Sequence, residues 1–229
     1  MTPNVAANYA RVCEQVALAA QRCGRSPEAI TIVCAAKTKG PQLVRAALAA
    51  GATDIGENYV QEAQEKIILV PEPARWHLIG HLQRNKARVA ARLFTLIHSL
   101  DSVALAQELH HQGEKLGVVV RTLIEVNLGN EPTKSGMAVP QVDSLLEKVA
   151  TLPYLRVEGL MTIPPPGASA EAARPYFRKL VQLQEQYTRF RTTNIALREL
   201  SMGMTDDYAV AIEEGATLVR IGRAIFGER

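Results

Sequence analysis

The sequence predicts an α/β fold, a single (β/α)8 barrel that spans residues 1–229 and carries an extra N-terminal helix. Short apolar runs rich in β-branched residues alternate about eight times with amphipathic segments of helical length, which is typical of a parallel sheet with crossover helices. A chain of 229 residues, 47% of them hydrophobic, supplies one such core, since a barrel of this kind needs roughly 200 residues or more. An open doubly wound sheet is the alternative, and eight units with no second domain favour closure.

The elements follow in order along the chain. The opening segment, Val5 to Arg22, is amphipathic and ends at Cys23-Gly24, where glycine commonly ends a helix. The eight predicted strands are 30–36, 53–56, 75–79, 94–98, 118–128, 155–163, 198–201 and 217–221. The helices between them begin near residues 41, 59, 84, 101, 140, 170 and 205. Pro41 and Pro140 suit first helical turns, because proline lacks the N–H that is unpaired there anyway.

Polar or small residues follow almost every predicted strand, whereas the strand bodies are apolar. Active sites of these barrels lie at the carboxyl ends of the strands. The residues at those ends are Lys37, Glu57-Asn58, Gly80-His81, Ser99, Asn127, Met161-Thr162, Ser201-Met202-Gly203 and Arg220 to Gly222. This pattern predicts one site at that end of the barrel.

Lys37 stands directly after the first apolar strand. An amine against apolar walls loses hydration, so its pKa falls and the neutral form becomes available to a carbonyl group. A solvated lysine at a strand end is the alternative, and for an isolated lysine it is the commoner one. Lys39 points to the same side of the chain but lies farther into the loop, beside Gly40-Pro41. These observations favour Lys37 as a reactive amine.

Two segments after the last two strands are candidates for phosphate binding. Barrels of this type often hold phosphate there through backbone N–H groups, and small residues let an anion approach closely. The segments are Ser201-Met-Gly203 and Gly222-Arg223. Asp206 and Asp207 begin the next helix, where they would repel an anion. We therefore assign phosphate to the Ser201 turn and the Gly222 loop.

Several other classes of protein are disfavoured. No apolar run reaches the roughly 20 residues of a membrane span, and the first residues lack a secretory signal. Three cysteines without a CxxC pair indicate a reducing compartment, and we expect a cytoplasmic protein. The net charge of +3 identifies no partner.

Two clusters of polar residues have simpler explanations than a binding site. Arg84, Arg88 and Arg92 share one helical face, which a solvated barrel helix explains better than nucleic-acid binding. His77 and His81 fall on a strand and a loop with no other ligand in register, so we expect no metal site.

Seven blocks in chain order resemble the pyridoxal phosphate homeostasis proteins, and the match covers nearly the whole chain. The blocks are Ala36-Lys-Thr-Lys39, Gly56-Glu-Asn-Tyr-Val-Gln-Glu62, Trp76-His-Leu-Ile-Gly-His-Leu-Gln-Arg-Asn-Lys86, Lys134-Ser-Gly136, Gly159-Leu-Met-Thr-Ile163, Leu200-Ser-Met-Gly-Met-Thr-Asp-Asp207 and Val219-Arg-Ile-Gly-Arg-Ala-Ile-Phe-Gly227. The resemblance implies the barrel of bacterial alanine racemases and the cofactor pyridoxal 5'-phosphate (PLP), held as an aldimine (Schiff base).

The resemblance also implies a set of cofactor-binding residues. The aldimine would form on Lys37, the ring would lie near Asn58, and Arg220 would face the pyridine nitrogen. The phosphate would be held by Ser201, Met202, Gly222 and Arg223. Arg223 departs from the family, which usually has threonine or serine there, so its side-chain contact is in question. The loop from Asn130 to Thr133 also varies.

The resemblance implies a role in balancing vitamin B6 and amino-acid pools. An arginine facing the pyridine nitrogen leaves that nitrogen unprotonated and weakens the ring as an electron sink. Related racemases need a second acid/base tyrosine from a further β-domain of a partner subunit, and this chain ends at Arg229, after the last barrel unit. We expect a monomeric PLP carrier or regulator without strong catalysis, with PLP-dependent apoenzymes as recipients. A PLP-dependent amino-acid racemase is the alternative, and a nucleic-acid or protein-binding barrel is a distant third.

Overall fold

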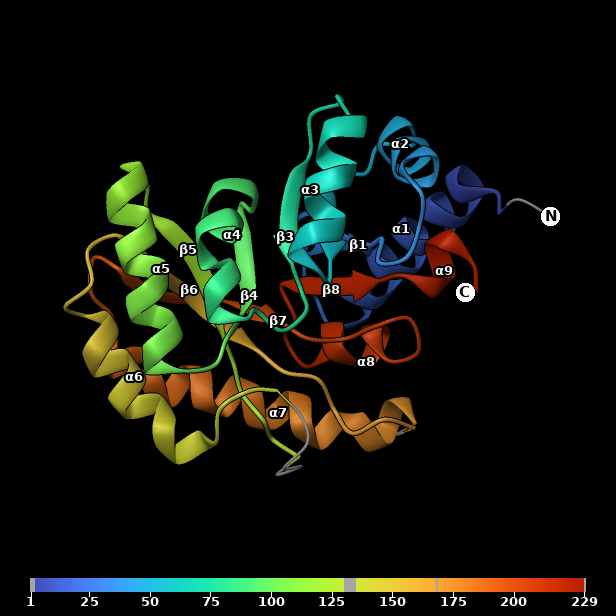
Figure 1. The fold of residues 1–229 in the computed structure, drawn as a ribbon. Coiled ribbons are helices and arrows are strands. Elements are labelled where there is room, and N and C mark those ends of the chain that lie inside the picture. Colours follow the sequence, from blue (N-terminus) through green and yellow to red (C-terminus); the bar gives the residue numbers. More distant parts are fainter. Residues whose placement is uncertain (1–2, 130–134, 168, 229) are drawn as a thin grey trace.

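The structure, a computed structural model, describes residues 3–129, 135–167 and 169–228. Eight parallel strands pair in chain order, and β8 pairs with β1 to close a barrel (Figure 1). The strands are β1 (Thr31–Ala35), β2 (Asp54–Glu57), β3 (Arg75–Leu78), β4 (Leu96–Leu100), β5 (Val120–Glu125), β6 (Leu155–Met161), β7 (Ile195–Ser201) and β8 (Leu218–Ile221). The predicted (β/α)8 barrel is confirmed.

Helices surround the strands on the outside (Figure 1). They are α1 (Val5–Arg22), α2 (Pro41–Ala49), α3 (Val60–Leu69), α4 (Ala87–Leu93), α5 (Val103–Leu116), α6 (Val142–Val149), α7 (Ala170–Tyr187), α8 (Tyr208–Glu213) and α9 (Arg223–Phe226). Short 3-10 turns at Arg84–Lys86 and Val139–Gln141 lead into α4 and α6. Helices α5 and α7 begin at serine caps, because Ser102 and Ser169 accept hydrogen bonds from backbone N–H groups of the first turn.

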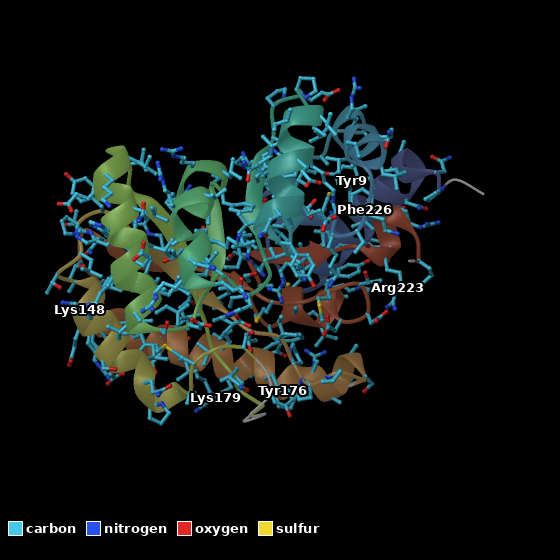
Figure 2. The ribbon with its side chains drawn as sticks, in the orientation of Figure 1. Tyr9, Lys148, Tyr176, Lys179, Arg223 and Phe226 are labelled. Carbon is cyan, nitrogen blue, oxygen red and sulfur yellow. The ribbon has the colours of Figure 1, made fainter. Side chains whose placement is uncertain are left out.

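The extra N-terminal helix completes the outer ring. Strand β8 is followed by α9, which has only four residues, and α1 contacts α8, α9 and α2. Val5, Val12 and Val16 are buried on one face of α1, and Asn8 Nδ2 donates to the carbonyl of Ile225 at 3.0 Å. Figure 2 labels Tyr9 on α1 and Phe226 on the contacting α9. Helix α1 therefore fills the ring position that follows β8 in a regular barrel.

Strand β4 differs from its prediction. It begins at Leu96, two residues later than expected, because Phe94 closes α4 through its N–H to the carbonyl of Ala90 (3.0 Å). Ser99 consequently lies inside the strand and is fully buried, rather than at the strand end.

The interior of the barrel is filled by side chains. A small apolar cluster there comprises Val33, Ile79, Leu96, Leu123, Met161 and Leu218. Polar groups share this space. His98 on β4 lies 2.9 Å from the hydroxyl of Ser201 on β7, and since these strands are not neighbours, the contact crosses the interior. The barrel is a packed core, as is usual for this architecture.

Candidate functional site

A cavity of about 500 Å³ opens at the carboxyl ends of the strands. It is lined by residues in or after the carboxyl ends of β1, β2, β3, β6, β7 and β8. These are Ala35, Lys37, Lys39, Asn58, Ile79, Ile163, Met204, Thr205, Asp206, Arg220, Gly222, Arg223, Gly227 and Glu228. The cavity thus brings together five of the seven residues that the sequence predicts for the site, namely Lys37, Asn58, Arg220, Gly222 and Arg223.

Ser201 and Met202, the other two predicted residues, are fully buried and are not among the lining residues. The hydroxyl of Ser201 accepts a hydrogen bond from Arg220 Nη1 at 2.5 Å. The N–H of Met202 donates to the carbonyl of Leu218 at 3.1 Å. Ser201 therefore does not line the cavity itself but contacts Arg220, which does. A direct contact of Ser201 or Met202 with phosphate stays a prediction.

Helix α3 holds the backbone on both sides of Lys37, which is half-buried in the turn after β1. Lys66 Nζ donates to the carbonyl of Ala36 at 2.7 Å, and the carboxylate of Glu62 accepts the N–H of Thr38 at 2.6 Å. Lys66 and Glu62 are themselves paired at 2.7 Å. Thr38 has φ of 63°, in the left-handed region that β-branched residues rarely adopt. One ion pair thus fixes an unusual turn around Lys37.

Glu57 completes this cluster beneath the turn. Its side chain is fully buried, and one carboxylate oxygen accepts from Lys66 Nζ at 2.7 Å. Burial raises the pKa of Glu57 to about 7, although the hydrogen bond and charge of Lys66 oppose the rise. Glu57 therefore holds its proton to a higher pH than an exposed glutamate does.

Lys39 also lines the cavity, and its amine lies at the end of α9. Its Nζ donates to the carbonyls of Gly227 at 3.0 Å and Glu228 at 2.7 Å. These contacts tie the loop after β1 to the loop after α9, which is a structural role for this lysine.

Arg220 places a buried positive charge at the cavity wall. Its guanidinium is 4% exposed and donates to Ser201 Oγ and, through Nη2, to the carbonyl of Thr162 at 3.0 Å. Burial lowers its pKa to about 10, opposed by the charges of Glu125 and Asp207, so it stays protonated at neutral pH. Such a group favours a ligand atom that carries a lone pair or negative charge.

Two glycines allow close backbone packing beside the cavity. A Cβ on Gly222 would lie 3.0 Å from the carbonyl oxygen of Ala35, and one on Gly80 would lie 2.4 Å from that of Asn58. At both positions a larger residue would displace backbone that borders the cavity.

Arg223 has acidic partners at the rim. Its Nη2 forms an ion pair with the Asp206 carboxylate, and its Nε lies 3.4 Å from Glu228 Oε1. Figure 2 shows Arg223 extending outward from the start of α9. Asp207 accepts the N–H of Met204 at 2.6 Å and precedes α8, which begins at Tyr208 instead of near Thr205 as predicted. The sequence-based expectation that both aspartates repel an anion omitted the compensating charge of Arg223.

A second cavity of about 330 Å³ adjoins the first and shares Asn58, Ile79 and Ile163 with it. It adds Glu125, whose pKa is raised to about 7 by burial and by Asp101, with Arg220 opposing. Its lining continues through Gly80, His81, Val126, Asn127 and Ser135. Lys134 and the preceding variable loop, residues 130–133, lie outside the described residues.

Three buried residues have contacts that the sequence did not predict, and of these three only His77 was considered, as a possible metal ligand. Asp54, His77 and His98 link to Ser201 by side-chain hydrogen bonds. Their signal in the sequence is a polar residue in the body of an otherwise apolar strand, as in Trp76-His-Leu78 and Ile97-His-Ser99. Buried polar side chains of this kind need specific partners.

Two further findings concern the described part of the chain. No group of three or more His, Cys, Asp or Glu side chains there is arranged to hold a metal ion. None of its helices has the length and apolar character that crossing a bilayer requires.

Comparison with known proteins identifies relatives over the whole barrel. The family model of the alanine racemase N-terminal domain matches residues 8–229. A pyridoxal phosphate homeostasis protein of Aquifex aeolicus is 43% identical over 227 residues, covering 99% of each chain. PipY of Synechococcus elongatus, solved with PLP bound, is 34% identical with a TM-score of 0.80, covering 94% of this chain and 100% of its own.

The fold is shared more widely. Alanine racemase from Bartonella henselae, solved with covalently bound pyridoxal phosphate, has a TM-score of 0.72 at 14% identity, covering 98% of this chain and 58% of its own. At that identity the likeness concerns the fold alone.

Proposed function

Because this chain belongs to the alanine racemase N-terminal domain family and, within it, to the pyridoxal phosphate homeostasis proteins, we propose that it binds PLP and helps to balance the intracellular supply of this cofactor and of amino acids. The observation that carries the proposal is the convergence of an amine, an amide and a buried guanidinium in one cavity. PipY, solved with PLP bound, supports it as a relative at 34% identity.

The cavity fits the chemistry of PLP. The cofactor brings an aldehyde that amines attack, a pyridine nitrogen and a phosphate dianion, and it acts as an electron sink when it is bound. The Lys37 amine is the group that would bond to the aldehyde carbon. Asn58 would lie against the ring, and Arg220 would donate to the ring nitrogen from a wall where it stays protonated.

For the phosphate we propose the side of the cavity formed by Gly222 and Arg223. Both line the cavity, and Gly222 keeps the backbone close without a side chain. Ser201 and Met202 belong to the proposed set as residues beneath this wall, since Ser201 contacts Arg220. All four remain predictions for a phosphate contact.

We propose a carrier or regulator rather than an enzyme. Racemisation needs acid/base groups on both faces of the substrate carbon. Neither tyrosine nor histidine lines the larger cavity within the described ranges, and Lys39 is engaged by two backbone carbonyls. PLP-dependent apoenzymes are the proposed recipients of the cofactor.

An amino-acid racemase is the second candidate, favoured by the match to the family model of the alanine racemase N-terminal domain. Single enantiomers of common amino acids incubated with the PLP-loaded protein should remain unchanged beyond the turnover given by free PLP. Racemisation that disappears in Lys37→Ala would establish the racemase instead.

Covalent attachment tests PLP binding directly. Adding PLP should produce a visible absorption band, and borohydride reduction should fix a pyridoxyl group on Lys37, located by peptide mass spectrometry. Lys37→Ala should lack the band and keep the fold, since a side chain facing a cavity contributes little packing. Lys39→Ala is the matched control and should retain the label on Lys37. A label on Lys39 or Lys134 would refute the assignment.

A further inference from the structure

A continuous chain of side-chain hydrogen bonds crosses the barrel interior and ends at the cavity. Asp54 Oδ1 lies 2.9 Å from His77 Nε2, and His77 Nδ1 lies 2.9 Å from His98 Nε2. His98 Nδ1 lies 2.9 Å from Ser201 Oγ, which accepts from Arg220 Nη1 at 2.5 Å. All five side chains are buried. The chain therefore joins the first residue of β2 to the residue of β8 that borders the cavity.

The far end of this chain is a firmly held carboxylate. Arg75 donates to Asp54 through Nε at 2.7 Å and Nη2 at 2.6 Å, and Thr53 Oγ1 donates at 2.7 Å. Burial alone would favour the protonated carboxyl, but the hydrogen bonds from His77, Arg75 and Thr53 outweigh it and hold the pKa of Asp54 below its usual range. Asp54 is therefore ionised and can only accept hydrogen bonds.

The two ends limit the direction of the bonds between them. A guanidinium only donates and a carboxylate only accepts, so His77 Nε2–H donates to Asp54. Burial and the nearby charge of Arg220 lower the pKa of His98 well below its usual value, so this ring is neutral and carries one N–H. The direction that leaves Ser201 as an acceptor for Arg220 places this N–H on Nε2, where it donates to His77 Nδ1. The Ser201 hydroxyl then donates to His98 Nδ1, and its lone pairs accept from Arg220.

We propose that His77 and His98 are positioning residues that orient Arg220 toward the cavity through Ser201. The Ser201 hydroxyl donates its proton to His98 Nδ1, so the lone pairs of its oxygen accept the hydrogen bond from Arg220 Nη1. The carbonyl of Thr162 holds Nη2, so the guanidinium is fixed at two points. The Ser201 hydroxyl then contributes to the cavity as an acceptor for Arg220. This inference rests on the proposed function, in which Arg220 faces the PLP ring.

The need to fill the barrel interior does not by itself explain this chain of polar side chains. Apolar side chains of similar volume would fill the interior without the desolvation cost of five polar groups. The chain also ends at a buried charged group, Arg220, whereas apolar filling would need no such group. Both features follow if the chain serves to hold a charged group in one orientation.

The first test needs no cofactor. Nitrogen NMR on protein carrying 15N-labelled histidine distinguishes the two neutral tautomers, and the five histidines can be assigned by single His→Gln substitutions. We expect a neutral His98 with its proton on Nε2, and a His77 that is protonated on Nε2 and accepts through Nδ1. A proton on Nδ1 of either ring, or a charged His98 at neutral pH, would overturn the proposed direction.

The second test asks whether the chain acts on PLP. His98→Phe removes both ring contacts at similar volume and should weaken PLP binding about tenfold, as expected for a lost hydrogen bond in a chain that holds a charge, and shift the visible band. His98→Gln keeps a donor and an acceptor and should restore most of the affinity and the band. Ser201→Ala should weaken binding in the same way as His98→Phe.

Thr122→Val is the matched control. Thr122 is fully buried on β5, and its hydroxyl donates to the carbonyl of Arg156 at 3.1 Å, outside the chain that reaches Arg220. The variant should therefore lower stability without changing PLP affinity or spectrum. If wild type binds no PLP, the proposed function fails while the tautomer result still stands. If wild type binds PLP and folded His98→Phe and Ser201→Ala bind it equally well with the same spectrum, the positioning role is refuted.

Discussion

Lys66 on α3 links this helix to the turn that contains Lys37. Replacing Lys66 should therefore change the reaction of Lys37 with PLP. Lys66→Met removes the bond to the Ala36 carbonyl and the pairing with Glu62, which holds the strained Thr38. Together with the bond to Glu57, the substitution removes three hydrogen bonds of Lys66 Nζ. We expect PLP binding to weaken by about tenfold or more, because the turn around Lys37 loses these links to α3, and borohydride fixation on Lys37 to slow.

The control for this prediction is Lys179→Met, which should behave as wild type, since Lys179 is an exposed residue of α7 (Figure 2) that does not line the cavity. Unchanged PLP affinity and fixation rate in folded Lys66→Met would show that the turn keeps its shape without α3.

Glu57 should make stability depend on pH. Its pKa rises from 4.5 to about 7 on folding, so the folded chain binds this proton more tightly than the unfolded chain does. The stabilisation is present below pH 4.5 and is lost as pH rises through about 7. Glu57→Gln cannot ionise, so the free energy of unfolding of wild type should fall relative to this variant between pH 4.5 and about 7. Urea denaturation across this range measures it, and parallel pH curves would contradict the prediction.

Arg223 and Asp206 form an exposed ion pair at the rim, and water and salt screen such pairs so that they contribute little to stability. Arg223→Thr leaves the Asp206 charge uncompensated near the proposed phosphate site. PLP affinity should fall by less than about tenfold, with the loss greatest at low salt. Adding Asp206→Asn should restore the affinity. A larger loss that Asp206→Asn does not restore would make Arg223 a direct phosphate ligand.

The turn between β7 and α8 depends on Gly203. Its φ is +91°, and a Cβ there would lie 2.6 Å from the Cβ of Ala211 and 2.9 Å from the Cα of Tyr208. Its carbonyl also accepts the N–H of Arg220 at 2.9 Å. Gly203→Ala should therefore reduce both the free energy of unfolding and PLP affinity.

The variant Gly24→Ala separates the two causes of the lower free energy of unfolding in Gly203→Ala, which are backbone strain and steric clash. Gly24 has φ of +70°, but a Cβ added there would meet no atom within 4 Å beyond its chain neighbours, so the variant suffers backbone strain without a clash. Gly203→Ala should lose more than about 1 kcal/mol beyond Gly24→Ala in chemical denaturation. Equal losses would mean that the turn shifts to make room.

Much of the element order could be predicted from local sequence. Alternation of β-branched runs with amphipathic segments located all eight strands, because strand and helix periodicity are local properties. The start of β4 was misplaced because Phe94 looks like a strand residue and instead ends α4. The position of α1 in the ring depends on contacts with α8 and α9, some 200 residues away, which periodicity does not reveal.

The residues of the site that stand at strand ends could also be predicted from the sequence. Lys37, Asn58 and Arg220 stand at strand ends, which the barrel architecture itself identifies as the site. The chain through His77 and His98 was not predicted, because its link from His98 on β4 to Ser201 on β7 joins distant strands across the interior. The ion pair of Arg223 with Asp206 was not predicted either, since it arises from the fold.

At the scale of the whole molecule, packing of α1 should be coupled to PLP binding. Helix α1 supports α9, whose first residue, Arg223, lines the cavity. Val12 is buried on α1, and Val12→Ala should lower the free energy of unfolding by about 2 kcal/mol through a cavity. PLP at about 100 times its Kd should raise the free energy of unfolding of this variant by roughly 2.7 kcal/mol, because PLP binds only the folded protein. Thermal denaturation with and without PLP measures both effects, and a variant that PLP cannot stabilise would show that the cavity is lost as well.

The place of α1 in the ring has a consequence for the time course of synthesis. The ribosome makes α1 before the helices α8 and α9 against which it packs. The valine face of α1 therefore lacks these neighbours while the strands from β1 to β7 are made. The contact between Asn8 and Ile225 spans 217 positions, and such distant contacts form late. The nascent chain should thus acquire its cofactor-binding cavity only after α8 and α9 have left the ribosome, when α1 can pack against them.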